Sequence, residues 1–287
     1  MGLAFVNKLS LNNKINVWNR TERSHFFKHK HNINKVNNLH ELFQNSEIIF
    51  VCISGDKEIY DYIFDLKNFS HDLKNKTIID FSTIEKETAI YLHHSIKENY
   101  NSHYVESPVS GGPEGVETGS ISCIFHCDKI HKDFVTNWLE KIFLNFYYLP
   151  YSGMPQSIKV LNNLLESIHL LAASEVIGVS KELGLDLVDF KNSINILRGN
   201  SVYFNVLIDR IINSIDSENI SATINTRIKD LDIVSKYCHS NSNHFLKLSY
   251  KLFCEAKDKG FGNKDQTYIY NYLNSVHTKT KRVPVTI

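Results

Sequence analysis

The sequence has few cysteines and no long apolar run, and both features restrict the class of protein. It holds five cysteines in 287 residues, and none of them forms a CxxC pair. An odd number of thiols without such a pair favours a reduced, intracellular protein, so we expect a cytoplasmic location. No apolar run approaches the roughly 20 residues that a membrane span needs, so no membrane insertion is predicted.

The chain also lacks an excess of charge of either sign. Its 32 basic and 31 acidic residues leave a formal net charge of +1. A balance of this kind provides no overall electrostatic attraction to nucleic acid or to an anionic membrane. We therefore predict no nucleic-acid partner and expect the ligand to be a small molecule.

No metal site is predicted, although histidine is plentiful. Cys123, His126 and Cys127 could offer zinc ligands, but the alternating pattern SISCIFHC is typical of a strand in which cysteine is a small apolar residue. His25 and His29 lie one helical turn apart and lack a third ligand at a suitable spacing. The solvated face of a helix is the better interpretation of that pair.

Residues 1–151 alternate short apolar runs with helical patterns, which predicts an α/β domain with a parallel sheet. The predicted strands are 14–18, 47–53, 76–81, 103–109, 120–125 and 145–149. The predicted helices are 21–29, 38–45, 57–67, 85–98 and 129–142.

Residues 152–287 have a different character, with long patterns of period 3.6 and almost no strand signal. One long helix is predicted over "SIKVLNNLLESIHLLAASEVIGVSKELGL", closed by Gly184 at a C′ position. Further helices are predicted near 186–197, 202–214, 223–239, 243–258 and 264–275. This change of pattern predicts a second, all-α domain that begins at residue 152.

Polar residues follow two of the predicted strands. Asn19, Arg20 and Thr21 come after the first one, where a dinucleotide-binding unit meets the adenosine ribose, and an arginine there accommodates the 2′-phosphate of NADP. Ser82 and Thr83 close the strand of IDFST, and ligands of open α/β sheets gather at such strand ends. Taken alone, the first motif is more simply interpreted as a solvated arginine. The second is more simply interpreted as the cap of the next helix.

The stretch ESPVSGGPEGVETGS holds a turn of small residues, Ser110, Gly111 and Gly112, directly after a predicted strand. Small residues let the backbone approach a ligand closely, and consecutive N–H groups can hold an anion. An ordinary glycine turn is the alternative, which the length of the motif makes less attractive.

The long helix carries a polar stripe beside its apolar one. Lys159, Asn162, Asn163 and Glu166 share one face at helical spacing. A lysine shielded from water suits general acid–base chemistry, because burial disfavours its charged form. For a single lysine, a solvent-exposed position on the helix surface is the default interpretation. The same holds for the pair Lys229 and Asp230 in RIKDLDIV.

Taken together and in this order, the motifs resemble those of the β-hydroxyacid dehydrogenase family over nearly the whole chain. The matching stretches are NRT, IDFST, SPVSGGPEGVETGS, GMPQSIKVLNN, ASEVIGVSKELGLD, LRGNS and RIKDLDIV. That family includes 3-hydroxyisobutyrate dehydrogenase and semialdehyde reductases, with 6-phosphogluconate dehydrogenase more distant. The resemblance implies a Rossmann-like, doubly wound parallel sheet followed by an all-α domain for substrate binding and dimerisation. It also implies NAD(P)-dependent hydride transfer to or from a small β-hydroxyacid or semialdehyde.

The resemblance assigns a role to each polar motif and makes the stripe on the long helix part of an active site in the cleft between the domains. Lys159 is the catalytic acid and base. The substrate-binding residues are Ser110, Gly111, Gly112, Asn162, Asn163 and Lys229. The cofactor-binding residues are Gly2, Asn19, Arg20, Thr21, Ser82, Thr83, Lys229 and Asp230, of which Asp230 orients Lys229. Arg20 favours NADP, with NAD possible.

The sequence departs from the family at its start. Family members begin with a strand and a GxGxMG turn that leads into the first helix. Only Met1 and Gly2 match, at the last two positions of the turn, so the resemblance keeps the helix that follows them. The expected first strand lies in the middle of the sheet, in the order 3-2-1-4-5-6. We therefore expect its two neighbours to lose a partner, because nothing else in the predicted order lies between them.

Two other functions compete with the dehydrogenase. An imine reductase shares the scaffold, but Lys159 argues against it, because that relative usually carries another residue at the catalytic position. A truncated, non-catalytic homologue that only dimerises is favoured by the short start and opposed by Lys159, Asn163 and Lys229. The resemblance implies a homodimer or homotetramer in either case.

Overall fold

The computed structural model describes residues 1–21, 27, 30–62, 73–214, 220–238 and 242–277. The chain separates into two compact units, unit 1 (residues 1–159) and unit 2 (residues 160–287). The predicted histidine pair, His25 and His29, lies outside the described residues, as does most of the predicted helix 21–29. None of the described helices is both long enough and apolar enough to cross a membrane.

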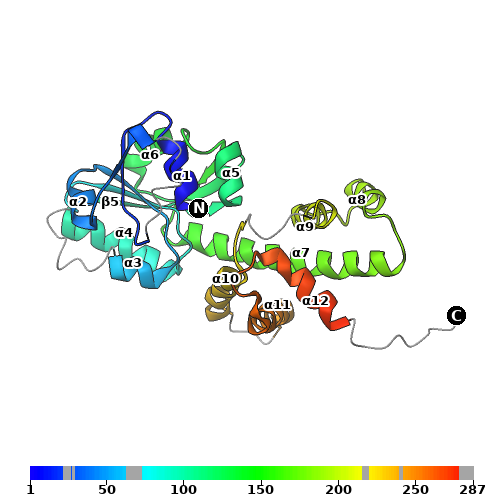
Figure 1. Cartoon of the computed structure of the whole chain (residues 1–287). Helices are drawn as coiled ribbons and strands as arrows, with labels where there is room; N and C mark the ends of the chain where they lie inside the picture. Colours follow the sequence, from blue (N-terminus) through cyan, green and yellow to red (C-terminus); the bar gives the residue numbers. More distant parts are fainter. Residues whose placement is uncertain (22–26, 28–29, 63–72, 215–219, 239–241, 278–287) are drawn as a thin grey trace. The chain divides into compact units, whose positions relative to one another are not determined.

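Unit 1 contains eight described strands in three small sheets (Figure 1). Two parallel strands form the first sheet, β1 (Ile15–Val17) and β2 (Ile33–Lys35). Three parallel strands form the second, in the order β3 (Ile48–Val51), β4 (Thr77–Asp80) and β5 (His103–Glu106). In the third, β7 (Ser122–Phe125) pairs antiparallel with β6 (Val109–Ser110) and parallel with β8 (Asn145–Tyr148).

The predicted fold class is confirmed, with mostly parallel strands in unit 1 and helices in unit 2. Among the described residues, the strands form three sheets rather than one. β1 and β3, which the family order places on either side of the expected first strand, belong to separate sheets. The predicted strand 103–109 is wrong as one element. It divides into β5 and β6 at Ser107 and Pro108, because proline has no N–H to donate to a ladder.

Helices pack around these strands; α1 was expected from the resemblance alone, and α5 was not predicted. The helices of unit 1 are α1 (Gly2–Leu9), α2 (Leu39–Gln44), α3 (Asp56–Tyr62), α4 (Lys86–Tyr100), α5 (Gly112–Thr118) and α6 (Lys132–Leu139), with short turns η2 (Lys30–Asn32) and η3 (Lys129–His131). α1 forms because Phe5 packs on Phe81 at a ring distance of 4.5 Å, which anchors the helix to the sheet. α5 begins with glycine and proline, and a proline in the first turn is compatible with a helix. The short, polar strand β2 was also not predicted.

Apart from one isolated bridge between Thr223 and Asp265, the regular elements described in unit 2 are all helices, as predicted. α7 (Met154–Glu182) begins in unit 1 and continues into unit 2, and Gly184 follows its end with a φ of +73°, as expected of a C′ glycine. The other helices are α8 (Leu187–Asn195), α9 (Val202–Ile212), α10 (Ile224–Lys236), α11 (His244–Ala256) and α12 (Ile269–His277), with η4 (Lys257–Phe261) and η5 (Gln266–Tyr268) between the last two. The side chains of Asp186, Ser201 and Thr223 cap α8, α9 and α10 by accepting hydrogen bonds from N–H groups of the first turn.

Candidate active site

In unit 1, Ser82 ties together the ends of two neighbouring strands. Its hydroxyl oxygen accepts a hydrogen bond from the N–H of Ile53, after β3, at 3.0 Å. Its own N–H donates to the carboxylate of Asp80, at the end of β4, at 2.8 Å. Thr83 follows directly and is half-buried. Both predicted residues therefore lie at the carboxyl ends of parallel strands, where ligands of such sheets bind.

Gln156, which was not predicted, fixes the first turn of α7 to this loop. Its amide oxygen accepts from the N–H of Ile84 at 3.1 Å, and its amide nitrogen donates to the carbonyl of Ser82 at 3.1 Å. Lys159 follows three residues later on the same helix, so one helical turn separates it from a residue that holds the strand-end loop. The signal was present in the motif GMPQSIKVLNN, where the glutamine precedes the lysine by three positions.

The side chain of Lys159 is buried rather than displayed on the surface, with 8% of the residue exposed. Lysine is almost never this deeply buried in a helix unless a neighbour or a function requires it. Lys159 is therefore not the solvent-exposed surface residue that the sequence alone suggests by default.

The turn Ser110–Gly112 requires both of its glycines. Gly111 has a φ of +131° and Gly112 a φ of +65°, which L side chains rarely adopt. A Cβ at Gly111 would lie 3.1 Å from the Cα of Ile121. Two successive residues of the turn, Gly111 and Gly112, therefore leave their backbone without side chains, and turns of this kind can hold an anion such as a carboxylate.

Glu106 connects the end of β5 with the start of α7. Its carboxylate accepts a hydrogen bond from the N–H of Gly153 at 2.6 Å, and 1% of the residue is exposed. Burial raises the pKa of this carboxyl group to about 7, and the hydrogen bond from Gly153 offsets part of the shift. Gly153 itself has a φ of +82°, so the turn into α7 also depends on a glycine.

The predicted adenosine-side residues form an exposed polar turn after β1. The amide of Asn19 donates to the carbonyl of Thr21, and the guanidinium of Arg20 donates to the hydroxyl of Tyr62 on α3 at 3.5 Å. That hydrogen bond raises the pKa of Arg20. Gly2 begins α1 and lies close to the end of β3. A Cβ atom added to Gly2 would lie 3.8 Å from the carbonyl oxygen of Cys52, the residue that follows β3.

In unit 2 the structure brings four predicted residues together. The amide of Asn163 donates to one carboxylate oxygen of Asp230 at 2.7 Å, and the ammonium of Lys229 lies 3.1 Å from the other. Asn162 donates to Glu166 at 2.7 Å. Asp230 thus contacts both an amide and a cation; its role in cofactor binding stays a prediction.

A buried cation network supports this group and was not predicted. The guanidinium of Arg227 donates to the main-chain carbonyl of Asn163 at 3.0 Å and pairs with Glu166 at 2.8 Å. Glu166 also accepts from the hydroxyl of Tyr203 at 2.9 Å, and Gln266 accepts from the Nε of Arg227 at 2.9 Å. These partners lie up to 64 positions apart in sequence, so only the packing of α7, α9, α10 and η5 brings them together.

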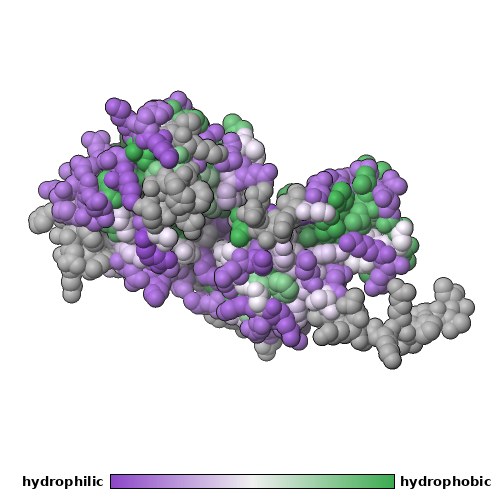
Figure 2. All heavy atoms as spheres, viewed as in Figure 1, coloured by the Kyte–Doolittle hydropathy of each residue, from purple (hydrophilic) through white to green (hydrophobic). Residues whose placement is uncertain are grey.

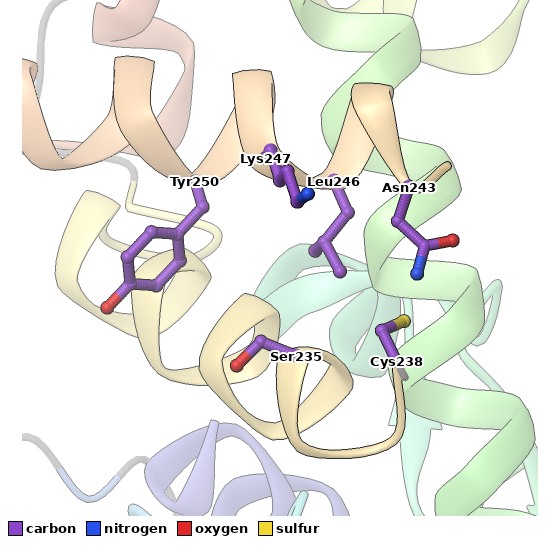
Figure 3. Close-up of a pocket in the computed structure, with 6 residues that line it drawn as sticks. All are labelled: Ser235, Cys238, Asn243, Leu246, Lys247 and Tyr250. Atoms are coloured by element: carbon purple, nitrogen blue, oxygen red, sulfur yellow. The ribbon is translucent and has the colours of Figure 1, made fainter. Parts of the chain in front are cut away.

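A separate hollow lies between α10 and α11 (Figure 3). It is lined by Ser235, Cys238, Asn243, Leu246, Lys247 and Tyr250. None of the predicted site residues lines it, since these residues lie in one polar group within unit 1 and another within unit 2.

Two family models match consecutive parts of the chain. The one described as the NAD binding domain of 6-phosphogluconate dehydrogenase matches residues 1–149. The one described as the NAD-binding domain of NADP-dependent 3-hydroxyisobutyrate dehydrogenase matches residues 153–273.

Individual relatives agree with these matches. Mitochondrial 3-hydroxyisobutyrate dehydrogenase of Drosophila melanogaster is 24% identical over 240 residues, which cover 81% of this chain and 74% of that protein. 2-Hydroxy-3-oxopropionate reductase of Escherichia coli is 24% identical over 160 residues, 55% of this chain and 54% of that protein.

Solved structures resemble the chain over 95% of its length. The structure titled Psf3 in complex with NADP+ and 2-OPP has a TM-score of 0.88 at 28% identity and is covered to 96%. 3-Hydroxyisobutyrate dehydrogenase from Salmonella typhimurium has a TM-score of 0.81 at 16% identity, also covered to 96%, and this likeness concerns the fold alone.

Proposed function

The chain belongs to the β-hydroxyacid dehydrogenase family of NAD(P)-dependent oxidoreductases, and from this premise we propose that it reduces a small semialdehyde or oxidises the corresponding β-hydroxyacid, with NADP preferred. The observation that carries the proposal is the buried Lys159, one helical turn from Asn163 on α7. A buried lysine beside an oriented amide is what a proton transfer to a small carbonyl compound requires.

Lys159 handles the proton in this proposal. In the reducing direction its ammonium donates a proton to the carbonyl oxygen, and in the oxidising direction its amine accepts the proton of the hydroxyl group. A bound nicotinamide supplies or accepts the hydride. Burial of Lys159 restricts access of water to the proton that is transferred.

The substrate-binding role falls to two groups of donors. The successive N–H groups of Ser110, Gly111 and Gly112 suit a carboxylate. Asn163 donates to the substrate while Asp230 fixes its amide, with Asn162 beside it and Lys229 as a cation held by the same carboxylate.

The described residues fit a nicotinamide dinucleotide in their chemistry. Ser82 and Thr83 stand at strand ends, and Gly2 starts a helix close to the end of β3, where a phosphate can approach a backbone without a side chain. Arg20 offers an exposed guanidinium after β1, with Asn19 and Thr21 on either side. A guanidinium in this place favours the 2′-phosphate of NADP over the free hydroxyl of NAD, and the Psf3 structure with NADP+ supports the same choice.

Mutation of Lys159 tests the proposed chemistry. With a panel of small semialdehydes and NADPH, we expect Lys159→Ala to lower kcat by about 10²–10⁴-fold, the range that a general acid contributes. Lys251→Ala, at a lysine whose side chain is 71% exposed on α11, is the matched control and should leave kcat unchanged. Equal turnover in wild type and Lys159→Ala would assign the chemistry to another residue.

Cofactor binding separates the enzyme from a non-catalytic homologue. NADPH at about 100 times its dissociation constant should stabilise the protein by about 2.7 kcal/mol, with a smaller effect of NADH at the same concentration. Arg20→Gln should remove the difference between the two cofactors. No thermal shift with either would favour the non-catalytic alternative.

A second copy of the chain is the partner that we propose for an apolar surface of unit 2. Large side chains lie exposed around α8 and the start of α9, where Figure 2 shows a hydrophobic area. They include Leu183 (70%), Ile196 (86%), Leu197 (58%) and Val202 (76%). Exposed apolar groups of this number mark interaction surfaces. Sedimentation should give a dimer or tetramer, and Ile196→Glu should shift it towards monomer.

A further inference from the structure

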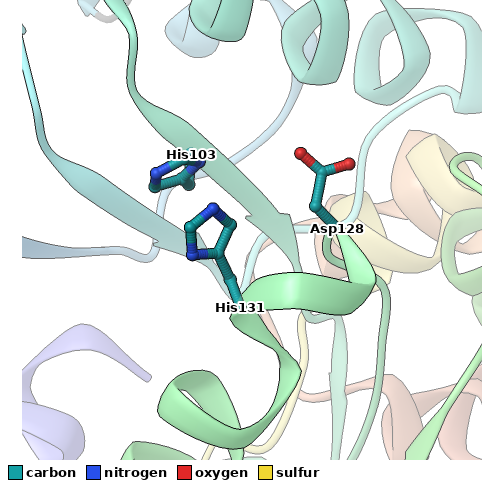
Figure 4. A group of neighbouring side chains, drawn as sticks. All are labelled: His103, Asp128 and His131. Atoms are coloured by element: carbon teal, nitrogen blue, oxygen red, sulfur yellow. The ribbon is translucent and has the colours of Figure 1, made fainter.

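Four imidazoles surround one carboxylate in unit 1, away from the residues assigned to the reaction. His103 begins β5, while Asp128 and His131 lie before and at the end of the η3 turn (Figure 4). One potential ligand atom from each of these three residues lies within 4.8 Å of the other two. His93 on α4 and His126 after β7 complete the cluster, with their ring centroids 5.0 Å apart.

The two imidazoles of the central group face each other. The ring centroids of His103 and His131 are 3.5 Å apart. The Nδ1 atom of His103 is buried and accepts or donates no hydrogen bond among the described residues. Buried polar atoms normally have a hydrogen-bond partner or a metal ion, and the described residues provide no hydrogen-bond partner for this nitrogen.

Asp128 is held in place by neighbours of its own. One carboxylate oxygen lies 3.3 Å from the Nε2 of His93, and the other lies 2.8 Å from the ammonium of Lys97. His93 thereby orients the carboxylate as an outer partner does at a metal site, whereas the ammonium of Lys97 competes with a metal ion for the other oxygen. The side chain of Lys97 is 55% exposed, so it can leave the carboxylate without breaking a buried contact.

We propose that His103, Asp128 and His131 bind one divalent transition-metal ion, with zinc as the representative. Zinc accepts imidazole nitrogen and carboxylate oxygen at about 2.0–2.2 Å, so two ligands in a tetrahedral site lie about 3.4 Å apart. The potential ligand atoms of the three side chains now lie up to 4.8 Å apart, so these distances must shorten by little more than 1 Å when the metal binds. A fourth position remains for water.

The place of the site in the fold points to stabilisation rather than catalysis. His103 stands at the start of β5 and Glu106 at its end, about 10 Å further along the strand. Glu106 reaches the turn before α7, whereas His103 lies at the opposite edge of the sheet from Ser82. A metal here would bind β5 to the η3 turn without touching the reacting atoms, so the inference does not depend on the proposed function.

Zinc titration of the metal-free, full-length protein tests the site. Calorimetry should give one tight equivalent in the wild type. Loss of an outer partner already weakens a metal site roughly 10–100-fold, so His103→Gln and His131→Gln should each weaken binding by at least as much. His40→Gln, at an exposed histidine of the same unit on α2, is the matched control and should bind like wild type. Equal binding by wild type and His103→Gln would overturn the proposal.

The five cysteines require a readout that distinguishes thiolate from imidazole ligands. Cobalt in place of zinc should give a visible spectrum without a sulfur charge-transfer band, and such a band at one equivalent would assign the metal to cysteines instead.

Lys97→Gln provides a variant in which all three ligands remain. Removing the competing ammonium should strengthen binding about two- to fivefold, the scale of an exposed ion pair. Unchanged or weaker binding in this variant would contradict the site, because a metal on Asp128 must displace Lys97.

Discussion

The two units keep buried carboxylates in different ways. In unit 1, Asp80 and Glu106 accept hydrogen bonds from backbone N–H groups, and neither forms an ion pair with a described residue. Burial raises the pKa of both groups. In unit 2, Glu166 pairs with Arg227 and Asp230 pairs with Lys229. These carboxylates of unit 2 therefore lie beside cations, whereas those of unit 1 accept from backbone N–H groups and, at Asp80, also from the hydroxyl of Tyr104 at 2.8 Å.

Secondary structure explains the difference. Inside a helix, N–H groups donate to carbonyls four residues earlier and are not available to side chains. Strand ends and loops leave N–H groups free, such as those of Ser82 and Gly153. Asp265 supports this explanation, because it caps η5 in unit 2, accepts from the N–H groups of Ser221 and Thr267, and also pairs with Arg210. Where helix ends offer N–H groups, a unit 2 carboxylate uses them as well.

The largest effect is expected when a buried cation of unit 2 is removed. Arg227→Met leaves Glu166 without its cation and the carbonyl of Asn163 without its donor. Breaking a buried ion pair from one side costs about 3–5 kcal/mol. Both tryptophans, Trp18 and Trp138, lie in unit 1, so far-UV circular dichroism in urea should report the loss in the helices, while tryptophan fluorescence should change less.

The next largest effect concerns Glu106 and depends on pH. Its folded pKa of about 7 exceeds the ordinary 4.5, so the folded state holds a proton that the unfolded state releases. Stability is therefore fully present below pH 4.5 and falls as pH rises towards and through 7, by roughly 3 kcal/mol in all. Glu106→Gln keeps an acceptor for Gly153 and should remove this slope.

Tryptophan fluorescence in urea between pH 4 and 8 would measure the effect, since it follows unit 1. Glu98→Gln, at an exposed glutamate of α4, should retain the wild-type slope. A slope in Glu106→Gln equal to that of wild type would show that the carboxyl group titrates normally in the folded protein.

Sequence patterns found most of the elements and the candidate residues, because periodicity and local motifs carry that information. In the helices of unit 2, apolar residues recur with a period of 3.6 over many turns. The strand-end residues Ser82 and Thr83 follow a clear apolar run. The roles of Lys159, Asn163 and Lys229 came from the resemblance rather than from the pattern, and they remain predictions.

What the patterns missed depends on contacts far apart in the chain. Gln156 is 74 positions from Ser82, and Arg227 is 64 positions from Asn163, so no local signal links them. The pattern did not indicate α1 because its helical signal is short; the resemblance alone predicted a helix there, and its place is set by the contact of Phe5 with Phe81. The break between β1 and β3 was expected, but the division of the sheet into three was not, since pairing is a property of the folded chain.

The smallest effect is expected for the partly exposed cation beside Asp230. The side chain of Lys229 is 31% exposed, and the carboxylate of Asp230 keeps its hydrogen bond from Asn163 when the lysine is replaced by methionine. An ion pair that solvent reaches contributes about 0–1 kcal/mol, so Lys229→Met should lower the free energy of unfolding by no more than about 1 kcal/mol. Lys236→Met, at a lysine of the same helix that is 49% exposed and 3.7 Å from Asp232, is the matched control and should change stability even less.

The loss of stability should therefore decrease from Arg227 to Lys229 to Lys236, in the order in which the exposure of the cation increases. A loss at Lys229 as large as that at Arg227 would mean that the Asp230 site is screened from water far more than its surface suggests. The difference between the units would then rest on the presence of a cation and not on its burial.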